Sequence, residues 1–469
     1  MLKKYPFFIS ITVIYAALSA FLLNFGWETA SGSAVILLTL GYLLLGIPKL
    51  GGHIKLYGFF LALAIAAIGI SITFGAYNVI QAISVLAVLL LMLVLLVNSF
   101  YDDRKWGLGM VLAAMAVTAV TSLSQLLAPI THGRKYFSIG NTDEGKKRGN
   151  RTIWLSVLVM VPIVAVVLLL LSTADVLFKN LLSGFFDAFD GMEKVFPFLL
   201  RFVFLGAFSY AILSISEKRC FSELKGISTR KNPAAVYLTG VTLALIYVIF
   251  STIQIWGLFL KKLTLPENVT YAQYAREGFF QLLAVCIINF VLILICLAVF
   301  ERTALLKVIL TIITFTTYIL ILSSGLRMYM YVSRYGLSIL RMQVFWALSV
   351  LLLLFFGVLL LIYIPSFPLF RYALVCVTLF YLIFAYMKPA AVVTRYNWEH
   401  REEIGEFDAR YVVSLGADAH VEVLSRATKE ELTEYDLENR IKKFYNQHYA
   451  DYDSILSYNY SVRILRAKK

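Results

Sequence analysis

Ionisable and amide side chains within apolar stretches are the residues of this sequence that could carry chemistry. The stretch 271–289, YAQYAREGFFQLLAVCIIN, holds several of them at helical spacing. At about 100° per residue they fall within about a third of the helix circumference. We therefore expect a stripe that faces protein or a water-filled cavity, made of Tyr274, Glu277, Gly278, Gln281 and Asn289. Arg276 points away from this stripe and could pair with another helix.

Arginines recur every seven residues in a second stretch, 323–341, SSGLRMYMYVSRYGLSILR. On one continuous helix this spacing returns to the same face with about 20° of drift, and it would align Arg327, Tyr331, Arg334 and Arg341. Two interpretations stay open. The arginines could anchor an interfacial helix among lipid headgroups, or they could form a ladder that binds Glu277, Glu301 or an anionic ligand. Any single one could also join helices or snorkel to an interface.

Motifs for enzymatic chemistry are weak. The stretch 140–146 resembles a phosphate-binding loop, but Lys147 stands where serine or threonine would hold magnesium. The four cysteines lack metal-binding spacing. The five histidines lie outside the apolar stretches and are expected to be solvated, and 102–105 is expected to be a solvated loop. We expect no enzyme, metal or cofactor; a membrane enzyme using Asp187, Asp190 or Glu28 is a minor alternative.

Composition decides which elements must position these residues. Of the 469 residues 60% are hydrophobic and 15% are charged, and the mean hydropathy is +0.80. A soluble globule has no way to bury that much apolar surface. The sequence therefore predicts an all-α integral membrane protein, a polytopic bundle of 11–12 transmembrane helices with a small soluble C-terminal segment. The candidate spans are 6–24, 33–47, 56–74, 79–98, 106–128, 152–172, 198–216, 235–260, 278–300, 303–325, 342–364 and 369–387.

Lysines and arginines indicate the orientation of these spans. Lys3 and Lys4 favour a cytoplasmic N-terminus. If every candidate crosses, the basic segments 131–151 and 217–232 fall outside, against this rule. The simplest topology that satisfies the rule is one in which 106–128, whose second half is polar, does not cross. That topology has 11 spans and an external C-terminus. The topology in which every candidate crosses has 12 spans and an internal C-terminus.

We divide the chain into an N-terminal helical region (1–130), a basic loop (131–151), a second helical region (152–387) and an α-rich C-terminal tail (388–469). An amphipathic surface helix is expected over 174–197. The tail has 13 Lys and Arg against 14 Asp and Glu. Thr428 and Glu431 have the spacing of a helix capping box.

The net charge of +14 therefore belongs to the membrane region. Cationic loops facing anionic lipid explain it, and we expect no nucleic-acid partner. A transporter-like or channel-like bundle for an anionic or amphipathic ligand is the leading hypothesis. Charged side chains near membrane depth are costly unless paired, which makes them candidates for a function. The alternative is a membrane sensor or accessory subunit that binds a protein partner through 388–469.

Several stretches resemble an uncharacterised bacterial multi-pass family, domain of unknown function 4173. They are LPENVTYAQYAREGFF, RMYMYVSRYGLSILR and the tail's RYN…GEFDARYVVSLGADA. The family pattern ends in Asp-Ala-x-Pro, whereas this chain has His420 after Asp418 and Ala419 and no proline. The resemblance implies a bacterial cytoplasmic-membrane protein without an established activity, with family-like residues Tyr274, Arg276, Glu277, Arg327, Tyr331, Tyr335, Gly336 and Arg341.

Overall fold

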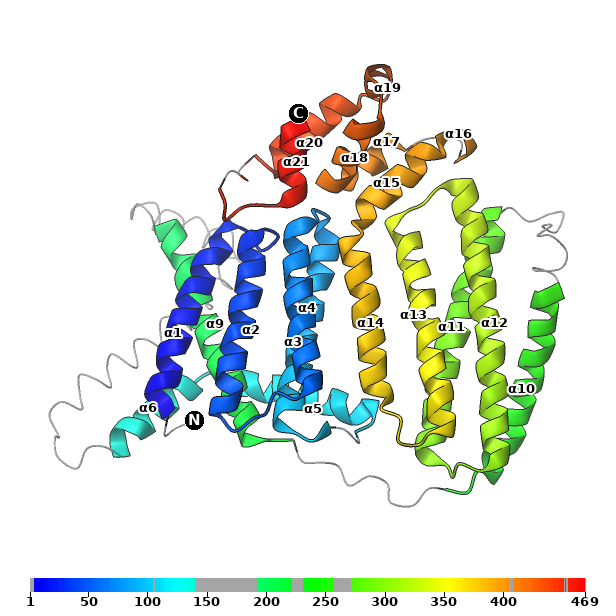
Figure 1. The fold of residues 1–469 in the computed structure, drawn as a ribbon, viewed down its shortest axis with the longest axis horizontal. Coiled ribbons are helices and arrows are strands. Elements are labelled where there is room, and N and C mark those ends of the chain that lie inside the picture. The colour runs from blue at the N-terminus through cyan, green and yellow to red at the C-terminus, as the bar shows by residue number, and fades with distance from the viewer. Residues whose placement is uncertain are drawn as a thin grey trace, which may run out of the picture.

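The structure is a computed structural model (Figure 1) that describes residues 4–103, 106–139, 192–221, 231–256, 271–404, 408–450, 452 and 454–468. Side chains are described for these residues except 137–139, 192–194, 235 and 271–278. In this part of the chain there is no β-strand, and ten helices are long and apolar enough to cross a membrane. They are α1 (Tyr5–Leu22, extended by the short η2, Leu23–Phe25), α2 (Ala30–Lys49), α3 (Leu56–Phe74), α4 (Asn78–Phe100), α9 (Met192–Lys218), α10 (Ala234–Gln254), α11 (Tyr271–Val299), α12 (Ala304–Tyr335), α13 (Ile339–Tyr363) and α14 (Leu369–Tyr386). The all-α membrane fold is confirmed.

Helix ends lie where the sequence supplies caps. Proline precedes the first residue of α10 (Pro233) and of α14 (Pro368), because its fixed φ suits the start of a helix. Thr303 and Ser338 accept hydrogen bonds from the first turns of α12 and α13. Gly336 ends α12 with a φ of 74°, a conformation that favours glycine.

The spans run up and down between two ends of the molecule, which we call the N-terminal face and the tail face. At the N-terminal face Lys4 Nζ donates to the Lys49 carbonyl at 2.6 Å, and Lys55 lies 3.6 Å from Asp102. The tail face carries the loops between α1 and α2, α3 and α4, and α12 and α13, with residues 388–468 on top (Figure 1).

The helix α5 (Leu108–Ser124) lies at the N-terminal face (Figure 1). Trp106, just before it, contacts Tyr101 and Phe221, and Gln125, just after it, accepts from Lys218 Nζ at 3.3 Å. Both ends of α5 therefore meet the foot of α9. A 65° bend then separates α5 from α6 (Ala128–Ile139). This agrees with the expectation that 106–128 is no simple span.

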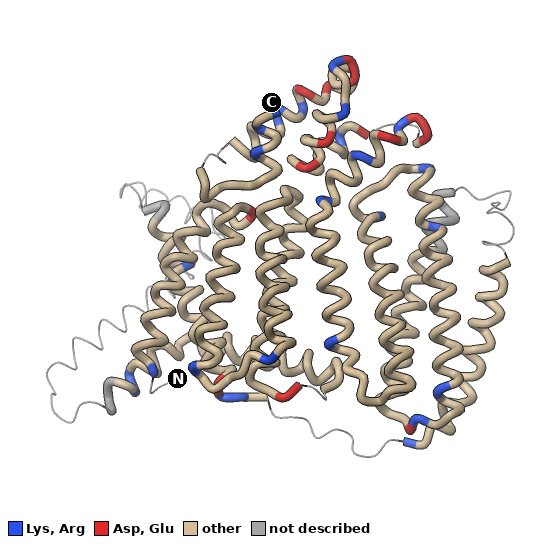
Figure 2. The backbone as a smooth tube through the Cα atoms, viewed as in Figure 1, with Lys and Arg blue, Asp and Glu red and all other residues tan. Residues whose placement is uncertain are grey.

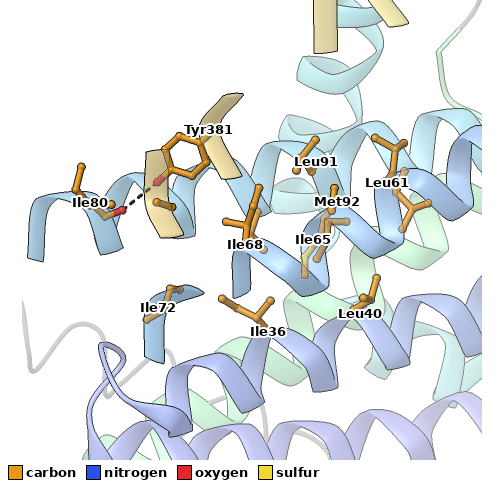
Figure 3. Packing of buried hydrophobic residues seen from close by; sticks show 14 of the residues in the cluster. Ile36, Leu40, Leu61, Ile65, Ile68, Ile72, Ile80, Leu91, Met92 and Tyr381 are labelled. Carbon is orange, nitrogen blue, oxygen red and sulfur yellow. Dashed lines mark hydrogen bonds between the residues drawn. The ribbon is translucent and has the colours of Figure 1, made fainter. Parts of the chain in front are cut away.

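Two groups of helices share the membrane region, with α14 between them (Figure 1). One buried core joins α1–α5, α9, α14 and the tail, and a second joins α10–α13. Figure 3 shows part of the first: Leu61, Ile65, Ile68 and Ile72 of α3 lie against α2 and α4. Their spacing of four, three and four residues places them on one helix face.

The tail folds into α15 (Pro389–Glu399), α16 (Arg401–Ile404), α17 (Ala409–Ser414), α18 (Ala417–Arg426), α19 (Lys429–Glu434), α20 (Leu437–His448) and α21 (Tyr460–Lys468). The predicted capping box at Thr428 and Glu431 is confirmed. Charges of both signs gather on the tail, whereas the spans are nearly free of them (Figure 2). The tail's core merges with that of the first helix group, so the tail is docked on the bundle.

The described ends of the chain, Lys4 and Lys468, lie on opposite faces (Figure 1). The 11-span alternative predicts ends in different compartments and the 12-span alternative predicts ends in the same one. Within the described residues there are ten candidate spans. The candidate span 152–172, most of the loop 131–151 and residues 174–191 of the surface helix expected over 174–197 lie outside the described residues. Residues 192–197 belong to α9.

The topology makes a direct prediction for reporter fusions. A fluorescent protein fused before Met1 should fluoresce in the cytoplasm, and alkaline phosphatase fused after Lys469 should be active outside it, since the tail is on the opposite face from Lys4. Swapping the two reporters should abolish both signals. Signals that place both ends in one compartment would contradict this arrangement.

Candidate functional site

Asp418 is the centre of the joint between the tail and the bundle. It lies in the first turn of α18, and its side chain is only 2% exposed. Its Oδ2 accepts from the backbone N–H of Ala76 at 2.7 Å, and its Oδ1 accepts from the Ser461 hydroxyl. The Lys388 ammonium lies 3.6 Å from Oδ1. This buried carboxylate of α18 thus has partners in α21, in the α3–α4 loop and at the end of α14, as such a group requires.

Lys388 holds the point where α14 turns into the tail. Its φ of 52° lies in the left-handed region, which a non-glycine residue adopts only when its surroundings hold it there. Its Nζ donates to Ser461 Oγ at 2.8 Å and lies 4.5 Å from the centre of the Tyr460 ring. These contacts bind the end of α14 to α21.

Amide side chains complete the joint at the end of α3. Gln81 Nε2 shares its hydrogens among the carbonyl oxygens of Glu28, Ile72 and Gly75 at 2.9–3.0 Å. Asn459 Nδ2 donates to the same Gly75 carbonyl at 2.8 Å. A cavity of about 10 Å³, near the minimum for one water molecule, is lined here by Ser71, Gln81, Ser84, Lys388 and Asp418, among others.

Two further attachments fix the tail. Asn397 of α15 pairs with both backbone groups of Leu337 in the α12–α13 loop: its Oδ1 accepts from the N–H at 2.7 Å and its Nδ2 donates to the carbonyl at 2.8 Å. The Tyr411 hydroxyl accepts from the N–H of Ile339 at 2.9 Å. At the start of α2, the Leu456 carbonyl accepts from the N–H and hydroxyl of Ser31 at 3.2 and 2.6 Å. The tail therefore clamps three loops, from both helix groups.

The opposite end of α14 has its own buried ion pair. Arg371 Nη2 lies 2.6 Å from Asp103 Oδ1, whose side chain is 2% exposed, and Asn98 Nδ2 donates to the same oxygen at 2.8 Å. The guanidinium also lies 4.8 Å from the Tyr57 ring centre. The expectation of a solvated loop over 102–105 is thus wrong for Asp103, because Arg371, 268 residues away, folds against it.

His420 is also buried, contrary to the expectation that the histidines are solvated. Its Nε2 donates to the Val413 carbonyl at 2.8 Å, and its ring meets the Phe444 ring edge-on at 5.1 Å. Burial lowers the pKa of this imidazole to about 4, since a charged form would lose its hydration. At neutral pH His420 therefore packs as a neutral side chain in the tail core.

The first predicted stripe divides. Tyr274, Arg276 and Glu277 lie in α11, but their side chains are outside the described residues, and Gln281 is exposed. Asn289 is fully buried; its Oδ1 accepts from the Tyr247 hydroxyl at 2.8 Å and its Nδ2 donates to Thr317 Oγ1 at 2.9 Å. This amide joins α10, α11 and α12, the role that polar side chains often have between membrane helices.

The predicted arginine ladder does not form one face. Since α12 ends at Tyr335 and α13 begins at Ile339, Arg341 lies on a different helix from Arg327 and Arg334. Arg341 donates to the carbonyls of Tyr335 and Gly336 at the end of α12 and lies over the Tyr331 ring, 4.3 Å from its centre. A cation there is favoured by the helix dipole.

The other two arginines also separate. Arg334 is exposed, whereas Arg327 is 8% exposed and donates to Gln254 Oε1 at 3.2 Å. Ser323 donates to the same oxygen at 2.7 Å. Gln254 is a polar residue within the predicted span 235–260, but no local pattern in the sequence pairs it with Arg327.

The joint residues Asn397, Tyr411 and Asp418 were not singled out from the sequence, although all three lie in the tail stretches that resemble a known family. A usable signal was their position, because each is a polar residue beside apolar ones in a short amphipathic helix. Among the described residues no three His, Cys, Asp or Glu side chains lie close enough to hold a metal ion. The chemistry of this site is ionic and hydrogen-bonded attachment.

Replacing Asp418 should loosen the tail. Asp418→Ala leaves the Lys388 ammonium and the Ala76 N–H without their acceptor, so we expect a loss of about 2–4 kcal/mol, less for Asp418→Asn. Thermal unfolding in detergent and protease cleavage of the tail measure it. Glu434→Ala is the control, because Glu434 is an exposed residue of α19 in the same tail. Equal behaviour of both variants would contradict the role of Asp418.

Comparisons with known proteins give a family and no activity. The family model of a domain of unknown function, DUF4153, matches residues 60–425, which is more than half of the chain. The match begins within α3 and ends in the last turn of α18. It leaves out α1 and α2 but includes the second helix group and the three tail residues Asn397, Tyr411 and Asp418. No curated protein and no solved structure matches. The resemblance to an uncharacterised family is confirmed at this level, while the 4173 type stays a prediction. The chain belongs to the DUF4153 family.

Proposed function

We propose that this multi-pass membrane protein is a sensor or accessory subunit, in which the tail on one face is coupled to the opposite face through α14. A partner that engages 388–469 would supply the input. The basic N-terminal face supports a cytoplasmic N-terminus in a bacterial plasma membrane, with anionic lipids facing these cations.

One observation carries this proposal: at each end of α14 a cation is paired with a buried carboxylate. Lys388 pairs with Asp418 at the tail face, and Arg371 pairs with Asp103 at the N-terminal face. Seventeen residues separate Arg371 from Lys388, about 25 Å of helix. Because α14 lies between the two helix groups and a helix resists bending, a shift of the tail would displace both ends of α14.

Contacts of the tail with both groups support the same proposal. Asn397 binds the α12–α13 loop, and Asp418 binds the α3–α4 loop. A partner that tilts the tail would change the spacing of these loops. Coupling of this kind needs two discrete arrangements of a shared element, and α14 packs against α3 of one helix group and α13 of the other.

A natural cysteine provides the test. Cys220 is exposed on the N-terminal face, beside Phe221, whose N–H donates to the Tyr101 hydroxyl near Asp103. If α14 couples the faces, Asp418→Asn should change the rate of maleimide labelling of Cys220 at least about threefold in native membranes. Buried Cys286 reports global unfolding and should keep its rate.

Asp436→Asn, an exposed change on the same tail, is the matched control and should alter neither rate. An unchanged Cys220 rate in the Asp418→Asn protein would overturn the proposal. Equal acceleration of Cys220 and Cys286 would do the same, since it would show general loosening rather than coupling.

A second candidate, transport of an anionic or amphipathic ligand, is favoured by one side of α10. Small and polar residues recur there every three or four positions over about 25 Å, as Tyr237, Gly240, Ala244, Tyr247, Ser251 and Gln254. Hydrogen bonds join this side to Thr303, to Asn289 and to Ser323 and Arg327. Through Gln254, this side of α10 binds one buried cation, Arg327 of α12, near the tail face.

Arg327 and Arg334 form a matched pair for testing transport, because they share α12 but only Arg327 is buried. In liposomes that contain the purified protein, Arg327→Gln should lower the efflux of chloride, phosphate or a short-chain fatty acid at least about tenfold. Arg334→Gln should leave it within about twofold. If the wild-type protein gives no efflux above empty liposomes for any of these probes, this candidate fails.

A further inference from the structure

A short turn of the tail, residues 454–458, presents an isoleucine to the surroundings of the bundle. Ile455 is 89% exposed, the highest value among the large hydrophobic side chains of the described residues. An exposed isoleucine on an extramembrane tail is unfavourable in water and favourable against lipid. Whether exposure of Ile455 is unfavourable or favourable therefore depends on its position relative to the bilayer.

The turn is built to hold that side chain in place. Ser454 and Ser457 bond reciprocally, each hydroxyl accepting from the other residue's backbone N–H at 3.0 Å. The Tyr458 N–H donates to the Ile455 carbonyl at 3.3 Å and closes the turn. A local hydrogen-bond pattern of this type fixes the backbone without help from Ile455 itself. The side chain is thus held at the tip of an ordered turn.

Backbone contacts set the depth of the turn. The Leu456 carbonyl accepts from Ser31, and the Tyr458 carbonyl accepts from the N–H of Ala30 at 2.8 Å, both in the first turn of α2. The twenty residues of α2, from Ala30 to Lys49, span about 30 Å, the thickness of the hydrocarbon core of a bilayer. With Lys49 at one boundary, the turn lies at the other.

Neighbouring side chains match that boundary. Trp27, two residues before Thr29, is 40% exposed, and so is Tyr460 just beyond the turn. Tryptophan and tyrosine concentrate at the membrane–water interface. The guanidinium of Arg463 lies 5.6 Å from the Tyr458 ring centre, a position suited to lipid phosphate. The turn and its neighbours thus combine the aromatic, aliphatic and cationic side chains that favour a membrane–water interface.

We propose that residues 454–458 form a membrane-contacting tip, with Ile455 inserted at the boundary between headgroups and acyl chains of the tail-face leaflet. The tail then has two supports, the loops of the bundle and the lipid surface. The occupant of this apolar tip is lipid. This inference is independent of the coupling through α14 and of transport.

Spin labels in the full-length protein test it. In a background with Cys220→Ser and Cys376→Ala, single variants Ile455→Cys and Glu434→Cys are labelled and placed in nanodiscs that contain anionic lipid. Oxygen partitions into lipid, and a nickel chelate stays in water. Position 455 should relax at least about threefold more with oxygen than with the chelate, and position 434, exposed on α19 at the far end of the tail, should show the reverse (Figure 1).

Trp27→Cys gives a reference at the same depth on the bundle and should match position 455. If position 455 prefers the nickel chelate as position 434 does, the tip lies in water and the inference is wrong. If both reagents are excluded from position 455, protein covers the tip, and contact with lipid is equally overturned.

Discussion

Polar groups at the ends of membrane helices are the constraint on which this structure depends. A helix satisfies its own backbone except in its first and last turns, and at the edge of the bilayer those groups need partners. On the tail face the tail provides them. The Ala76 N–H meets Asp418, the Gly75 carbonyl meets Asn459, and the α12–α13 loop meets Asn397. The tail is thus a continuation of the bundle's hydrogen bonding.

Burying charges in this joint is costly, so their partners must be complete. Asp418 has an N–H, a hydroxyl and an ammonium, and Asp103 has a guanidinium and an amide. Apolar residues of similar shape could give equal stability. What ion pairs add is position: each fixes one end of α14 to one particular element. That is the physical ground for assigning α14 a coupling role.

Period and composition predicted the spans well because a bilayer imposes them locally. Any helix that crosses needs about twenty apolar residues, and the positions of Pro233, Thr303 and Ser338 then set its ends. The same local reasoning failed for the arginines at 327, 334 and 341. A period of seven means one face only while the helix continues, and Gly336 interrupts it. Asn289 was expected to face protein or a cavity, and it is buried among α10, α11 and α12; its helix α11 is continuous.

The sequence by itself determined an all-helical membrane protein, most of its span boundaries, the doubt over 106–128 and the capping box of the tail. Each follows from residues close together in the chain. Tertiary structure alone decided that Asp103 pairs with Arg371 and that Asp418 binds Ala76 and Lys388. It also decided that His420 is buried. These contacts join positions up to 342 residues apart. Pairings of that kind depend on how helices pack, and a single sequence does not encode packing as a local pattern.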